Sequence, residues 1–161
     1  MPQSVPPIFS LRVTPARLGI IGRLVALAAA AVCLVPLIIA ARLTPNPTGL
    51  GTHIQLGFAP CPFDLYWGIP CPFCGMTTSW AWFVRGNLIA SLWVQPMGTL
   101  LAWLAVMMFW CGLYVGLTGR GAHRLLQYAP SGYIMRGLLL AAALAWNWKI
   151  FIQLHHLDGW H

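Results

Sequence analysis

The sequence predicts an all-α integral membrane protein: a helical bundle with three spans plus a re-entrant or interfacial helix pair. Of its 161 residues, 59% are hydrophobic and 7% are charged, whereas soluble domains carry roughly 25% charged residues. Three long apolar runs each have about the length that crosses a bilayer core of about 30 Å. No stretch alternates apolar and polar residues for long enough to build a sheet.

The first predicted span lies near residues 20–41, where the uncharged run Leu24–Ala41 stands between Arg23 and Arg42. At about 1.5 Å per residue this run reaches roughly 27 Å, and its flanking residues complete a crossing. A signal peptide is the alternative, but signal peptides have apolar regions of roughly 7–15 residues. We therefore expect a retained anchor. The proline-rich residues 1–17 are predicted to be a flexible tail, and residues 18–161 a single membrane domain.

The second predicted span lies near residues 97–117, and Pro96 suits its first turn, where a missing N–H is tolerated. The third lies near residues 133–154. It contains Asn147 and Lys149, polar groups that need water or a partner within a membrane. The long Lys149 side chain is expected to reach the nearby interface.

Residues 75–94 are apolar enough to enter the membrane, but Arg85-Gly86-Asn87 divides them. This pattern favours two short re-entrant or interfacial helices over a full span. Trp80, Trp82 and Trp93 are expected to anchor them, because indole rings are common at the headgroup level.

The arginines predict the orientation, because cytoplasmic loops carry an excess of positive charge. With three spans, two groups fall on one side and define it as cytoplasmic: Arg12, Arg17 and Arg23, and Arg120, Arg124 and Arg136. The N-terminus is then inside, and the cysteine-containing loop faces outside. Because the basic residues flank apolar runs, the net charge of +7 does not indicate nucleic-acid binding.

The segment 61–96 carries the chemistry, in Cys61 and the run Cys71-Pro72-Phe73-Cys74. Gly75 marks a helix start, which predicts a stabilised thiolate on Cys74. Cys71 and Cys74 are the catalytic candidates if the pair is redox-active, with Cys61 as the resolving thiol. We expect one disulfide within this trio, because disulfides persist outside the cytoplasm.

Two other interpretations of these cysteines stay open. Cys61, Cys71 and Cys74 can be zinc ligands, with His53, His155 or His156 as the fourth. They can also be packing residues in a rigid elbow. Cys33 and Cys111 lie inside predicted spans and are expected to pack there.

Residues 61–98 resemble a family of small bacterial membrane proteins catalogued as domain of unknown function 2752. Matching positions are Cys61, Pro62, Phe63, Gly68, Cys71, Pro72, Cys74, Gly75, Thr77, Gly86, Ala90 and Pro96. Thr78, Asn87 and Gln95 depart from the Arg, Asp and Asn usual in the family. The resemblance implies a multi-pass protein of the bacterial inner membrane and brings no established activity.

The sequence contains no hydrolase, kinase or nucleotide-binding motif. The first hypothesis is a non-enzymatic protein whose cysteine elbow is a structural element or a platform for another membrane protein in the lipid bilayer. The alternatives are a membrane thiol–disulfide oxidoreductase and a metal-binding protein. No cofactor is predicted under the first hypothesis; a quinone or zinc enters only under the alternatives.

Overall fold

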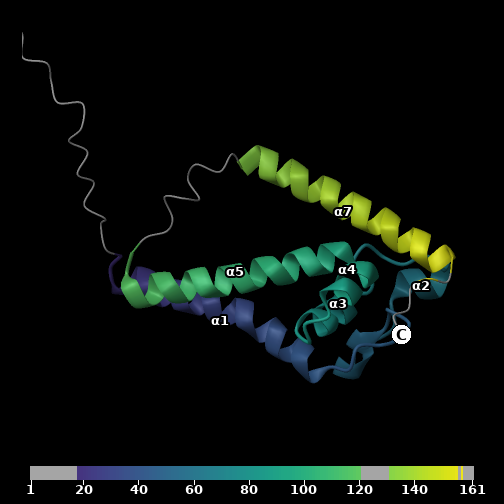
Figure 1. The fold of residues 1–161 in the computed structure, drawn as a ribbon, viewed down its shortest axis with the longest axis horizontal. Coiled ribbons are helices and arrows are strands. Elements are labelled where there is room, and N and C mark those ends of the chain that lie inside the picture. Colours follow the sequence, from purple (N-terminus) through teal and green to yellow (C-terminus); the bar gives the residue numbers. More distant parts are fainter. Residues whose placement is uncertain (1–17, 121–130, 156, 158–161) are drawn as a thin grey trace, which may run out of the picture.

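The computed structural model describes residues 18–120, 131–155 and 157. These residues form helices and loops, and they contain no β-strand. In chain order the elements are α1 (Ile20–Arg42), the 3₁₀-helix η1 (Thr52–Leu56), α2 (Pro62–Trp67), α3 (Met76–Phe83), α4 (Leu88–Val94), α5 (Pro96–Thr118) and α7 (Ser131–Leu154). The predicted all-α bundle is confirmed (Figure 1).

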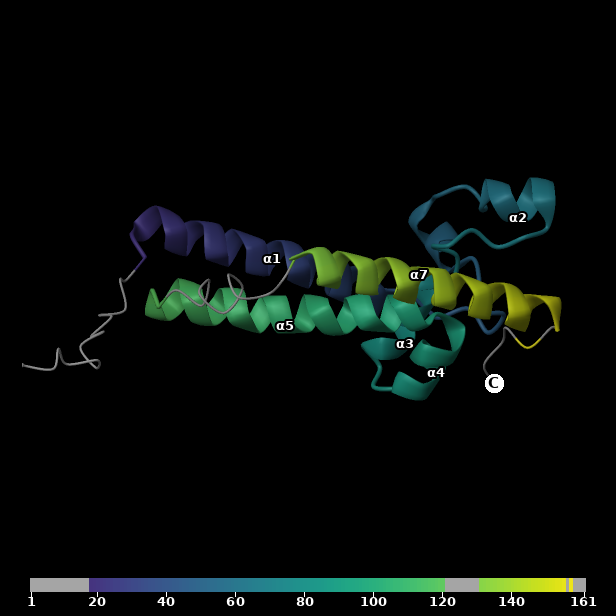
Figure 2. The same ribbon diagram turned by 90° about the horizontal axis from the view of Figure 1, so that it is seen from above.

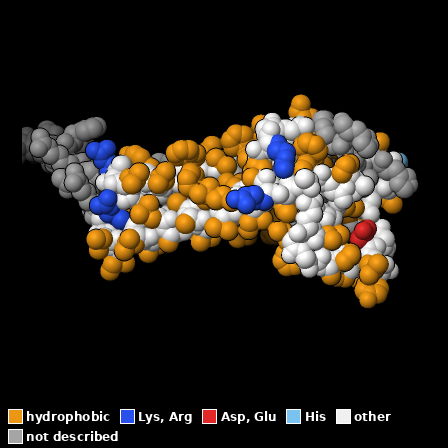
Figure 3. Space-filling view, turned by 90° about the horizontal axis from the view of Figure 1, so that it is seen from below, with side chains coloured by type: hydrophobic (Ala, Val, Ile, Leu, Met, Phe, Trp, Pro, Cys, Tyr) orange, Lys and Arg blue, Asp and Glu red, His pale blue; other side chains and the backbone are white. Residues whose placement is uncertain are grey.

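Three helices are long and apolar enough to cross a membrane: Ile20–Arg42, Pro96–Thr118 and Gly132–Leu154. Their bounds lie within two residues of the predicted spans. Figure 3 shows hydrophobic side chains across the elongated part of one face. Length and composition are those of a multi-pass membrane protein. The predicted tail, residues 1–17, lies outside the described residues.

Helices α1 and α5 lie side by side along most of their length (Figures 1 and 2). Glycines allow this approach, because a Cβ at Gly112 would lie 2.8 Å from the Ala26 carbonyl oxygen and one at Gly116 would lie 2.5 Å from the Leu27 side chain. Small residues bring membrane helices together in this way. Arg23 then donates from Nε to the Gly116 carbonyl oxygen over 2.8 Å.

The predicted helix pair is present as α3 and α4, with the break at residues 84–87. Asn87 begins α4 by accepting a hydrogen bond from the Ala90 N–H over 3.0 Å. Arg85 donates to the carbonyl oxygens of Ala81 and Leu43, each over 2.7 Å. Because both are backbone groups, Arg85 joins the end of α3 to the chain just after α1.

Buried hydroxyl groups join α3, α4 and α5. The Ser79 Oγ lies 3.0 Å from the Ser91 Oγ and 3.2 Å from the Thr99 Oγ1, and all three residues are buried. A Cβ on Gly98 would lie 2.9 Å from the Ser79 Oγ, so this glycine makes the close packing possible. The three short side chains satisfy one another inside an apolar environment. This compact core supports the cysteine segment.

Helix α7 diverges from α5 and reaches toward the end of the molecule that carries α2 (Figure 1). It meets the bundle in its second half, where Trp148 donates from Nε1 to the Trp93 carbonyl oxygen over 2.9 Å. The two indole rings also meet edge to face at 5.1 Å. Trp93 thus anchors α7 to α4.

Candidate functional site

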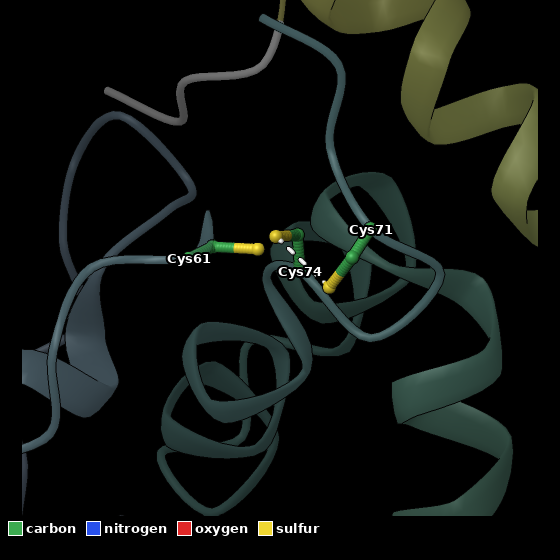
Figure 4. Close-up of side chains that lie close together, drawn as sticks. All are labelled: Cys61, Cys71 and Cys74. Atoms are coloured by element: carbon green, nitrogen blue, oxygen red, sulfur yellow. Dashed lines mark hydrogen bonds between the residues drawn. The ribbon is translucent and has the colours of Figure 1, made fainter. Parts of the chain in front are cut away.

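Cys61, Cys71 and Cys74 come together at one site, with their three Sγ atoms within 4.8 Å of one another (Figure 4). The Sγ atoms of Cys71 and Cys74 are 3.3 Å apart. Cys61 precedes α2, whereas Cys71 and Cys74 lie in the turn before α3. All five cysteines carry free thiols in this structure, and the expected disulfide stays a prediction.

Short turns bring the two segments together. Pro62 begins α2, and Gly68 ends it in the left-handed conformation with φ of 63°. The chain then returns, and the Cys74 N–H donates to the Cys71 carbonyl oxygen over 3.0 Å. The thiols of Cys71 and Cys74 therefore belong to one tight turn. The loop that contains α2 folds back on itself and so brings Cys61 beside this turn.

Gly75 ends this turn and is the residue from which α3 starts. Its φ is 82°, a conformation that residues with a Cβ rarely adopt. A Cβ would also lie 2.9 Å from the Gly49 carbonyl oxygen. Both the backbone conformation and the lack of space explain a glycine next to Cys74.

Helix α7 contacts the cysteine segment through one face. Trp146 donates from Nε1 to the Pro70 carbonyl oxygen over 3.0 Å, and Gln153 donates from Nε2 to the Asp64 Oδ1, also over 3.0 Å. Lys149 lies between them on this face and is fully buried, so the expectation that it reaches the interface is wrong. The spacing of three and four residues between Trp146, Lys149 and Gln153 is the sequence signal of this shared face. Asn147, by contrast, is exposed and donates to the Ala143 carbonyl oxygen.

The thiols differ in acidity. Burial raises the pKa of Cys61, but hydrogen bonds from the Asp64 N–H and from the other two thiols outweigh it and lower the pKa to about 7. For Cys74, burial and then the thiols of Cys71 and Cys61 raise the pKa well above its usual value. The expected stabilised thiolate on Cys74 is therefore wrong, because burial outweighs the helix start. Cys61 is therefore the more acidic of these two thiols.

A cavity of about 120 Å³ adjoins the cysteines and is lined by His53, Cys61, Asp64 and Cys74, among others. The His53 Nε2 lies 3.2 Å from the Ala59 carbonyl oxygen, so the ring is near the trio without joining it. The second predicted histidine, His155, instead packs on the Phe151 ring, with the ring centroids 4.6 Å apart. His156 lies outside the described residues.

The positions that depart from the family pattern have structural roles here. Buried Thr78 shares a hydrogen bond with the Thr52 hydroxyl, with 2.7 Å between the oxygens. Gln95 donates to the Pro72 carbonyl oxygen within the cysteine turn, and Asn87 begins α4. Neutral hydrogen bonds therefore occupy two places, Thr78 and Asn87, where the resembled family usually has a charged residue.

Residues 61–110 match the sequence model of the family described as Protein of unknown function (DUF2752). This match confirms the resemblance inferred from the cysteine motif, and it covers both cysteine segments, α3, α4 and α5 as far as residue 110. Neither a curated protein nor a solved structure matches the chain.

Proposed function

We propose that the segment matched by this family binds a soft metal ion, with the thiolates of Cys61, Cys71 and Cys74 as ligands. The observation that carries the proposal is the convergence of three Sγ atoms within 4.8 Å. Zinc–thiolate bonds of about 2.3 Å in a tetrahedral site hold sulfur atoms about 3.8 Å apart. The three thiols thus need little movement to share an ion, whereas a disulfide employs two of them.

The adjoining cavity supports the same proposal. Three thiolates leave one position of a tetrahedral ion to another ligand. The cavity beside Cys61 and Cys74 has room for a water molecule there, and His53 lines it. Thiolate ligands favour zinc, copper(I) and similar ions over magnesium or calcium.

The proposed setting is the bacterial inner membrane, with the N-terminus cytoplasmic and the cysteines on the outer face. Three span-length helices and the grouping of arginines near the same ends of those helices support it. A shared ion at the trio closes the loop that contains α2 and fixes it to the start of α3. This is the structural role expected of the cysteine elbow. The fixed loop also carries the exposed side chains of Tyr66 and Trp67, which are available to another membrane protein.

Thiol–disulfide exchange is the second candidate function, favoured by the 3.3 Å separation of the Cys71 and Cys74 sulfurs and by the acidic thiol of Cys61 beside them. Joining Cys71 to Cys74 releases two electrons and two protons, so this activity needs an acceptor such as a quinone. The two candidates predict different states of the same cysteines.

Metal analysis of the full-length protein tests the proposal. Protein purified from membranes without chelators is expected to hold a single ion per chain. Cys61→Ser, Cys71→Ser and Cys74→Ser should each lose it, while the control Cys33→Ser, in α1, retains it. Cobalt added to the metal-free protein should give thiolate-to-metal absorption that disappears in the same three variants. Metal-free wild-type protein with a Cys71–Cys74 disulfide in peptide mapping would overturn the proposal in favour of exchange.

A further inference from the structure

We infer that the three-thiolate site takes a divalent ion, with Lys149 of α7 as its buried counter-charge. This inference rests on the proposed metal site. It adds the charge class of the ion and a residue outside the segment that matches the family.

Lys149 is placed against the turn that carries the thiols. Its side chain has no exposed surface, and its Nζ lies 3.3 Å from the point that a Cβ on Gly75 would occupy. Gly75 directly follows the proposed ligand Cys74. The absence of a side chain at Gly75 therefore leaves room for the ammonium group at the site.

Two hydrogen bonds on the same face of α7 fix this position. Trp146, one turn before Lys149, donates to the Pro70 carbonyl oxygen, and Gln153, one turn after it, donates to the Asp64 carboxylate. Both acceptors belong to the loop between Cys61 and Cys71. Lys149 thus lies between the two residues through which α7 is hydrogen-bonded to the cysteine loop.

The net charge of the metal-bound site explains why a positively charged side chain stabilises it. Three thiolates around a divalent ion carry one net negative charge, which a lysine ammonium balances when the fourth ligand is neutral. Three thiolates around copper(I) carry two, and one lysine leaves a charge uncompensated. Burying uncompensated charge is costly. Besides Cys61 and Cys74, the ionisable side chains lining the cavity are His53 and Asp64. Asp64 is exposed to solvent, where its charge is screened.

The experiment compares Lys149→Met with Arg136→Met in the full-length protein in lipid nanodiscs. Arg136 is exposed in the first half of α7, so Arg136→Met removes the same charge from the same helix at a position outside the two contacts with the cysteine loop. Zinc affinity is measured by competition with a chromophoric chelator, and the melting temperature is measured with zinc and after chelation. Lys149→Met should weaken zinc binding about 10–100-fold, as loss of residues that support metal ligands commonly does. Its gain in melting temperature on zinc binding should shrink accordingly, and the gain in Arg136→Met should stay close to that of wild type.

The outcomes separate this inference from the proposal beneath it. Wild-type zinc affinity in Lys149→Met, with the three cysteines still required, would overturn the role of Lys149 and leave the metal site standing. A wild-type protein that binds no metal would remove both. If Lys149→Met does not accumulate, the ion in wild-type protein decides: zinc or another divalent ion supports the inference, and copper(I) overturns it. Lys149→Arg, which keeps the charge, should retain more affinity than Lys149→Met.

Discussion

Gln95 donates from Nε2 to the Pro72 carbonyl oxygen over 2.8 Å, which ties the residue before α5 to the turn between Cys71 and Cys74. Gln95 is fully buried and lies at the junction of α4 and α5. The longest interface of the bundle, between α1 and α5, is thereby coupled to the cysteine turn through one amide. The geometry of the proposed ligands depends on the membrane helices beneath them.

Gln95→Met is therefore expected to destabilise the protein by about 1 kcal/mol, because the half-buried hydrogen bond to the Pro72 carbonyl is lost while the side-chain volume changes little. The loosened turn should also weaken metal binding. Chemical unfolding in detergent gives the first quantity and chelator competition the second. Unchanged values for both would show that the amide does not hold the turn.

Gly75→Ala is expected to cost about 2–4 kcal/mol of stability, because it adds a left-handed backbone penalty to a clash with the Gly49 carbonyl oxygen. Gly57→Ala is the matched control: its φ is 83°, but a Cβ there meets nothing within 4 Å. The control should lose about 1–2 kcal/mol from the backbone alone. Equal losses in the two variants would contradict the close approach at Gly75.

Cys61 should react with maleimide in the chelated protein at a rate that rises around pH 7. Its pKa lies near 7, so the reactive thiolate grows from a minor to the major form between about pH 6 and pH 8. Cys74 has a raised pKa and should stay slow over this interval. Peptide mapping after timed labelling distinguishes the two. A Cys61 profile still rising steeply at pH 9 would contradict the lowered pKa.

The sequence was sufficient to predict the membrane bundle. Apolar run length located α1, α5 and α7, because a bilayer imposes a helix length, and the residues from Arg85 to Asn87 located the break between α3 and α4. The hydrogen bonds among the buried hydroxyl groups of Ser79, Ser91 and Thr99 were not predicted, because the sequence of an apolar segment does not indicate which hydroxyl residues bond to one another.

The candidate site was predicted in part. The sequence named all three cysteines, but their convergence depends on how the loop that contains α2 folds back. Gly68 permits this reversal of the chain, but its presence alone does not predict it. The acidity was assigned to the wrong thiol, because the burial of Cys74 arises from tertiary packing. Lys149 was missed as part of the site because a lysine near a span end ordinarily reaches water, and only the contacts of Trp146 and Gln153 show that this face turns inward.

Gly116→Leu should prevent α1 and α5 from packing. A Cβ at Gly116 already lies 2.5 Å from the Leu27 side chain, so a leucine there forces the helices apart. The substitution should also displace the Gly116 carbonyl oxygen that accepts a hydrogen bond from Arg23. Gly137→Leu on α7 is the control, because a Cβ there meets nothing within 4 Å. Protein levels in membranes and melting temperature in detergent should fall strongly for Gly116→Leu and little for Gly137→Leu. Similar behaviour of the two variants would mean that the glycine contact does not hold this helix pair together.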